Sequence, residues 1–111
     1  MNDRDKQIIS DILKAIERIL NAYENYKSID KIDDTEKKDF LYDIILSNLV
    51  LINNLYKNLS PKIIDNIKID WQLFDFYARE LLDTKKEIDN SLIINILEKD
   101  LPILQKFLKR A

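Results

Sequence analysis

The stretch FLYDIILSNLVLINNLY, residues 40–56, decides the fold, because apolar side chains would cover almost every side of a helix formed by it. Such a helix lies either at the centre of a bundle or between its own core and a partner. Two apolar faces can be distinguished, one with Leu41, Ile45 and Ile52 and the other with Ile44, Leu51 and Leu55. A domain of this size cannot easily cover both faces, so we expect a homodimer built on this helix.

The helix around this stretch is predicted to run over about 35–59, opened by a capping box of Asp33 and Glu36. Three asparagines lie within it, Asn48, Asn53 and Asn54. Two interpretations of them remain open. They can form hydrogen bonds across an interface and fix its register, or they can simply face solvent.

The segment before the central helix predicts a long amphipathic helix over 4–26, capped by Asn2 or Asp3. Residues 27–38 are polar without a sustained period and are interpreted as a loop. The inward stripe of the first helix recurs at a spacing of three and four and comprises Ile9, Ile12, Leu13, Ile16, Ile19, Leu20 and Tyr23.

Beyond the central helix, Ser60 and Pro61 are typical of a helix start and predict a short helix over 61–67, with Ser60 as its N-cap and Pro61 at its first position. Asp70 is expected to cap a further helix that begins at Trp71 and ends near Lys85 or Lys86. The inner face of that helix is predicted to consist of Phe74, Ala78, Leu81 and Leu82.

A last helix is predicted over about 91–109, capped by Asp89 or Asn90, with Pro102 expected to kink it rather than divide it. Its inward residues are expected to be Ile93, Ile96, Leu97, Leu104, Phe107 and Leu108. No strand pattern is present. The sequence therefore predicts one all-α domain over residues 1–111, an up-and-down bundle of four to five helices.

Composition excludes several classes of function. The 111 residues carry a formal net charge of −2, which argues against a protein that wraps DNA or RNA by bulk charge. No apolar run is long enough for a transmembrane helix, and the N-terminal residues do not resemble a signal peptide, so we expect a cytoplasmic protein without membrane contact. The chain contains no His, Cys or Gly, so imidazole and thiolate ligands and glycine-rich phosphate loops are ruled out. We expect no cofactor and no bound metal.

Several stretches together resemble the HepT-like branch of the HEPN superfamily, small helical toxins that pair with MNT-type nucleotidyltransferase antitoxins. They cover nearly the whole chain in the family's order: RDKQIISDILKAIERI (4–19), NLVLINNLYKNLSP (48–61), IDW (69–71) and EKDLPILQKFL (98–108). The resemblance implies a HEPN-like bundle, a homodimer and metal-independent RNA cleavage in which the ribose 2′-hydroxyl attacks the adjacent phosphate. It also implies an MNT-type partner, and RNA as the substrate.

The family's catalytic motif is an Arg, four residues, a His, one residue and a Tyr, after the Trp that opens the site helix. In this chain Arg79 matches the arginine, whereas Thr84 stands at the histidine position and Lys86 at the tyrosine position. Asn53 and Asn54 stand where the family usually has Gly-Glu. One of the three motif residues is therefore retained.

These departures bear on the chemistry. Arg79 can still bind a phosphate, because a guanidinium pairs bidentately with it. The hydroxyl of Thr84 does not ionise near neutral pH, and Lys86 could act as a base only if burial lowered its pKa strongly. Lys86 also lacks the phenol that the family's antitoxin modifies with nucleotide. We expect a degenerate site whose role is mainly protein interaction.

Alternative interpretations remain open at this stage. The chain could be an active ribonuclease that uses Arg79 with a substitute base, or a substrate-binding helical module for a separate nucleotidyltransferase. The stretch 79–86, RELLDTKK, could also be an ordinary helix end, with an Arg79–Asp83 pair along the helix and lysines at its last turn.

Two further groups of residues are expected to be structural. The aspartates of the loop region lack the spacing and the glycine of a calcium loop: Asp30, Asp33, Asp34 and Asp39. The aromatic residues of the site helix have the spacing of a core face rather than of a base-stacking platform: Trp71, Phe74, Phe76 and Tyr77.

Overall fold

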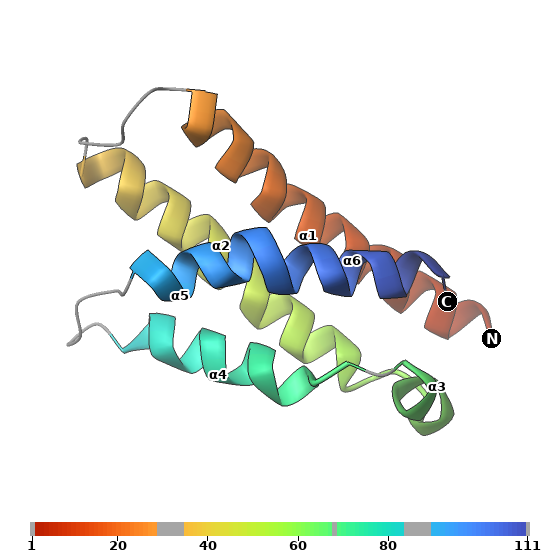
Figure 1. The fold of residues 1–111 in the computed structure, drawn as a ribbon. Helices are drawn as coiled ribbons and strands as arrows, with labels where there is room; N and C mark the ends of the chain where they lie inside the picture. Colours follow the sequence, from red (N-terminus) through yellow and green to blue (C-terminus); the bar gives the residue numbers. More distant parts are fainter. Residues whose placement is uncertain (1, 29–34, 68, 84–89, 111) are drawn as a thin grey trace.

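The computed structural model describes residues 2–28, 35–67, 69–83 and 90–110, and this part of the chain consists of helices and turns only. The prediction of an all-α protein is therefore confirmed. Figure 1 shows the elements in chain order, which are α1 (Asp3–Ser28), α2 (Thr35–Tyr56), α3 (Pro61–Asn66), α4 (Trp71–Leu82), α5 (Asn90–Asn95), η1 (Ile96–Asp100) and α6 (Leu101–Arg110).

The core lies between α1, α2, α4 and the rod formed by α5, η1 and α6. Helices α1 and α2 pack along each other, and α6 with η1 covers α1 (Figure 1). The large side chains with almost no exposed surface recur every three or four residues on α1, α2 and the rod. They are Ile12, Ile16, Ile19, Ile45, Leu49, Ile52, Ile96, Leu97, Leu101, Leu104 and Leu108. Burial of each such side chain stabilises the fold by about 1.5–3 kcal/mol, before the entropy of ordering it is subtracted.

Helix α1 begins where the sequence predicts it. The side chain of Asn2, rather than that of Asp3, caps it, because Asn2 Oδ1 accepts a hydrogen bond from the Asp5 N–H at 2.7 Å. The helix extends to Ser28, two residues beyond its predicted end, and α2 begins at Thr35, as predicted. The side chains of Asp33 and Glu36, which form the predicted capping box, lie outside the described residues.

Helix α2 presents its two apolar faces as predicted. Leu41, Ile45 and Ile52 are buried in the core, whereas Leu51 is 38% exposed. Ile44 and Leu55 are half-buried. The helix ends at Tyr56, three residues earlier than predicted, since the N–H groups of the next residues turn back to carbonyls three positions before them.

The Ser60–Pro61 start of α3 is confirmed. Ser60 occupies the N-cap position of α3 without a side-chain capping bond, because its hydroxyl donates to Asp5 Oδ2 at 2.7 Å instead. The Ser60 N–H donates to Asp5 Oδ1 at 2.9 Å. A buried carboxylate of α1 therefore takes the group that the sequence assigns to a local cap.

Helix α4 begins at Trp71 with Asp70 as its cap, as predicted, because Asp70 Oδ1 accepts a hydrogen bond from the Gln72 N–H at 3.1 Å. The helix ends at Leu82 rather than near Lys85. Leu82 is the last helical residue and is 56% exposed, so its predicted place on the inner face is wrong. The helix packs mainly against α2.

The last predicted helix is a continuous rod that contains a π-helical turn, η1. The Leu101 N–H donates to the carbonyl of Ile96, five residues before it, immediately ahead of Pro102. Proline has no N–H and its ring crowds the preceding turn, and the wider π turn accommodates both effects. Phe107 lies beside the buried stripe of Leu101, Leu104 and Leu108 and is 40% exposed, so the prediction that it points inward is wrong.

None of the helices in the described part of the chain combines the length and the apolar character needed to cross a membrane.

Candidate functional site

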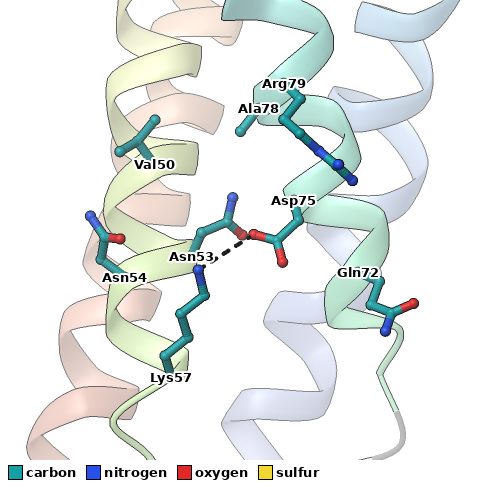
Figure 2. A pocket seen from close by; sticks show the side chains of 8 residues that line it. All are labelled: Val50, Asn53, Asn54, Lys57, Gln72, Asp75, Ala78 and Arg79. Carbon is teal, nitrogen blue, oxygen red and sulfur yellow. Dashed lines mark ion pairs between the residues drawn. The ribbon is translucent and has the colours of Figure 1, made fainter.

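An open groove with a volume of about 530 Å³ lies between α2 and α4. Figure 2 shows its side chains reaching from both helices. One wall belongs to α2 and the residue that follows it, and the other belongs to α4. The lining residues are Val50, Asn53, Asn54 and Lys57 on the first wall and Gln72, Asp75, Ala78 and Arg79 on the second.

The groove brings together Arg79, a site residue expected from the sequence, and two asparagines, Asn53 and Asn54. Arg79 is exposed on α4, while Asn53 and Asn54 lie on α2. The other two site residues expected from the sequence, Thr84 and Lys86, lie outside the described residues. Of the expected site, the structure therefore places Arg79 and its surroundings.

Asn53 is the polar link between the two walls. Its side chain is 6% exposed, and its Nδ2 donates to the carbonyl of Phe74 at 3.2 Å. Its Oδ1 is buried and accepts no hydrogen bond from any described residue. An acceptor left in this state costs stability and is uncommon in native proteins, so it marks a position where a donor is missing.

Asn48 and Asn54 behave differently from Asn53. Asn48 is buried at the α1–α2 contact, where its Nδ2 donates to the Ile44 carbonyl at 2.8 Å and its Oδ1 accepts from Arg18 Nη1 at 3.4 Å. Asn54 is exposed at the groove. Asn54 thus fits the interpretation of exposure to solvent, whereas Asn48 and Asn53 are buried and form hydrogen bonds between helices of the same chain.

Asp75 lies in the middle of the groove and carries its negative charge. Lys57 Nζ lies 4.0 Å from Asp75 Oδ1, and the Tyr56 hydroxyl donates to Asp75 Oδ2 at 3.0 Å (Figure 2 shows the ion pair). Burial, followed by this hydrogen bond, raises the pKa of Tyr56 above its ordinary value. Tyr56 is therefore a hydrogen-bond donor at neutral pH rather than a base.

The Tyr56 ring also stacks on Trp71, with ring centroids 4.6 Å apart and planes inclined by 12°. Trp71, Phe74 and Tyr77 are buried, so the prediction that these aromatic residues belong to the core is confirmed for them. Phe76 is the exception at 44% exposed. The aromatic faces next to the groove are thus already covered.

Arg79 carries the positive charge at the end of the groove. Within the described ranges its guanidinium has no ion pair and no hydrogen bond, and Figure 2 shows the side chain lying along α4. The predicted side-chain pair with Asp83 is not found there. The two residues are joined by the backbone instead, because the Asp83 N–H donates to the Arg79 carbonyl at 3.2 Å.

The groove offers groups that are suited to binding. Its lining residues supply two cations, one carboxylate and three amides. A guanidinium and amide groups can hold an anion or a polar chain in place. Of the loop aspartates, Asp39 is exposed and the others lie outside the described residues, which contain no group of residues suited to a metal ion.

Reasoning from the sequence missed Lys57, Gln72 and Asp75 as groove residues. The signal that could have found them is their position beside the inward stripe of α4 and at the end of α2, where polar residues border a contact between helices.

Comparisons with protein-family models, with curated proteins and with solved structures found no match for this chain.

Proposed function

We propose that this chain is a HepT-like protein of a toxin–antitoxin system whose ribonuclease motif has degenerated, and that it acts in the cytoplasm mainly through protein contacts. The observation that carries the proposal is the meeting of Arg79 with Asn53 and Asn54 in one groove. These residues lie on different helices, and the resemblance places Arg79 in the family's catalytic motif and the two asparagines at the family's Gly-Glu positions. Their meeting is what a HEPN-like up-and-down bundle would require.

The loss of cleavage follows from the residue types. Attack by a ribose 2′-hydroxyl needs a group that exchanges a proton near neutral pH, and a cation for the developing charge. The groove retains the cation in Arg79, while the histidine position holds Thr84. A chain without any histidine cannot restore the imidazole from elsewhere.

The partners proposed are a second copy of this chain and an MNT-type nucleotidyltransferase antitoxin. The exposed stripe of α2, which includes Phe40 at 61% and Leu51 at 38% exposure, supports the homodimer because it is apolar and lacks a cover in the monomer. Lys86 offers no phenol for nucleotide transfer, so we propose that the antitoxin controls this protein by binding rather than by modification.

The test is an RNA-cleavage assay on purified protein with single-stranded RNA. We expect the wild type to leave RNA intact, and a Thr84→His, Lys86→Tyr double variant to gain cleavage that a further Arg79→Ala change removes. Wild-type cleavage that survives stringent purification and disappears in Arg79→Ala would contradict the proposal.

That contrary outcome would favour the second candidate, an active ribonuclease with a substitute base. The observation in its favour is the exposed Arg79 guanidinium, which is unpaired within the described residues and so is free to bind a phosphate.

A further inference from the structure

We infer that the groove between α2 and α4 binds an acidic, partly apolar segment of a partner protein, whose carboxylate pairs with Arg79. The inference rests on the proposed function, because a role through protein contacts needs a docking surface. It adds the place of that surface and the chemistry of the segment that occupies it.

The charge of the groove favours an acidic segment. The groove contains Lys57 and Arg79 against the single carboxylate of Asp75, and Lys57 already lies 4.0 Å from that carboxylate. The charge left over is the guanidinium of Arg79, which is exposed and has no partner in the described part of the chain. A guanidinium binds a carboxylate through two parallel hydrogen bonds, which fixes the orientation of the segment that carries it.

The side-chain amides of the groove favour a peptide segment. Asn54 and Gln72 are exposed on opposite walls, and each side chain can both donate and accept a hydrogen bond, as a peptide backbone does. Asn53 Oδ1, buried between the walls, lacks a donor among the described residues. A backbone or side-chain N–H of a bound segment supplies that donor.

The apolar residues of the groove favour a segment that also carries an apolar side chain. Val50 and Ala78 line the groove, one on each wall. An apolar side chain next to the partner's carboxylate would bury this surface at the same time as Arg79 is paired. Interfaces of this kind take their affinity from a buried apolar contact and their register from charge.

RNA fits the groove less well than an acidic segment does. Asp75 would face the phosphates of a bound strand, and the chain as a whole is negative. Recognition of single-stranded RNA relies on aromatic faces for stacking, but no aromatic residue lines the groove, and Trp71 is stacked on Tyr56. The cation of Arg79 alone does not replace these features.

The experiment is a selection from a library of short random peptides against the intact protein. We expect enriched peptides to contain Asp or Glu beside an apolar residue, and to shift the side-chain amide signals of Asn54 and Gln72 in NMR spectra. Arg79→Ala should weaken the binding of these peptides by about tenfold or more, whereas Arg110→Ala, another exposed arginine on α6, should leave it unchanged. Arg79→Glu should abolish it. Both positions are exposed, so the folded state is expected to persist and is checked by circular dichroism.

Three outcomes would overturn the inference. The first is that no enriched peptide depends on Arg79, and the second is that enriched peptides carry no acid. The third is that an oligouridine RNA, or a second copy of the chain in sedimentation, occupies the groove in an Arg79-dependent way instead. The RNA-cleavage assay stays separate from these arms, since cleavage by the wild type refutes the proposed function while Arg79-dependent peptide binding still stands.

Discussion

The carboxylate of Asp5, near the start of α1, accepts both the N–H and the hydroxyl hydrogen bonds of Ser60, in the turn between α2 and α3. Asp5 is 2% exposed. The hydrogen bond from the Ser60 N–H, and then that from its hydroxyl, lower the pKa of Asp5 below its ordinary value. The contact fixes the end of the central helix to the first helix through a charged group.

Acid stability should depend on this carboxylate. A lowered pKa in the folded state contributes stability that is present above the unfolded pKa of about 4 and is lost as the pH falls through the folded pKa. We therefore expect Asp5→Asn to unfold at lower urea concentration at neutral pH and to show a shallower loss of stability in acid. Urea unfolding at a series of pH values measures both effects. Asp65→Asn, on the exposed face of α3, serves as the control, and an unchanged acid slope in Asp5→Asn would refute the assignment.

A second prediction concerns Tyr77, whose buried hydroxyl donates to Asp100 in η1. Tyr77→Phe should lower the free energy of unfolding by about 1–2 kcal/mol, because the partner carboxylate loses a donor. Tyr23→Phe, which removes a hydrogen bond to Glu98 at an exposed position, should cost less. Thermal unfolding compares the two variants, and equal losses would count against the prediction.

Tyr77 also predicts how stability changes in alkali. Burial, and then the bond to Asp100, raise the pKa of Tyr77 above its ordinary value. A raised pKa contributes stability that is fully present below the unfolded pKa of about 10 and is lost as the pH rises above it. We expect the wild type to lose stability above about pH 10 more steeply than Tyr77→Phe does, as followed by urea unfolding at alkaline pH.

The exposed stripe of α2 predicts a dimer in solution. Leu51→Lys should convert the dimer to a monomer without loss of helix, because a charge at the centre of the stripe opposes its burial. Ile94→Lys, at a residue of α5 that is 49% exposed, should leave the dimer intact. Sedimentation at micromolar concentration distinguishes the states. A wild type that sediments as a clean, soluble monomer would show that the stripe tolerates water.

Replacement of Asn53 is expected to weaken peptide binding without a large change in the free energy of unfolding. Asn53→Leu removes a buried amide whose Oδ1 has no described donor, so we expect stability to change by less than about 1 kcal/mol. Asn48→Leu should cost more, because both its amide groups are hydrogen-bonded. The Asn53 variant should nevertheless bind the selected acidic peptides more weakly. Thermal unfolding and peptide titration test this, and a large loss of stability in Asn53→Leu would contradict it.

The sequence predicts the helices well because apolar periodicity reports burial directly. The stripe of α1 and the two faces of α2 appear in the structure as predicted. Helix ends are predicted less well, since they depend on which distant group takes the last polar atoms. Ser60 is the clearest case, because its hydroxyl pairs with Asp5 of α1 rather than with its own helix.

The candidate site is predicted only in part. Arg79 could be named from its distance to Trp71, and the asparagines from the same resemblance. The opposing positions of Gln72 and Asp75 across the groove follow from how α4 packs on α2, which no local pattern encodes. Pro102 indicates a disturbance of the last helix, and in the structure this disturbance is a π turn over Ile96–Asp100, which the local sequence does not specify.

The one-sided packing of α4 has a consequence for hydrogen exchange. This helix packs mainly against α2, and the Tyr77 hydroxyl donates a hydrogen bond to Asp100 in the rod. Its amide protons should therefore exchange with solvent sooner than those of the α1–α2 pair, through openings that leave the rest of the core intact. The groove is formed only when α4 is packed on α2. A ligand bound in the groove therefore stabilises the packed form and slows the exchange of amide protons along the whole of α4.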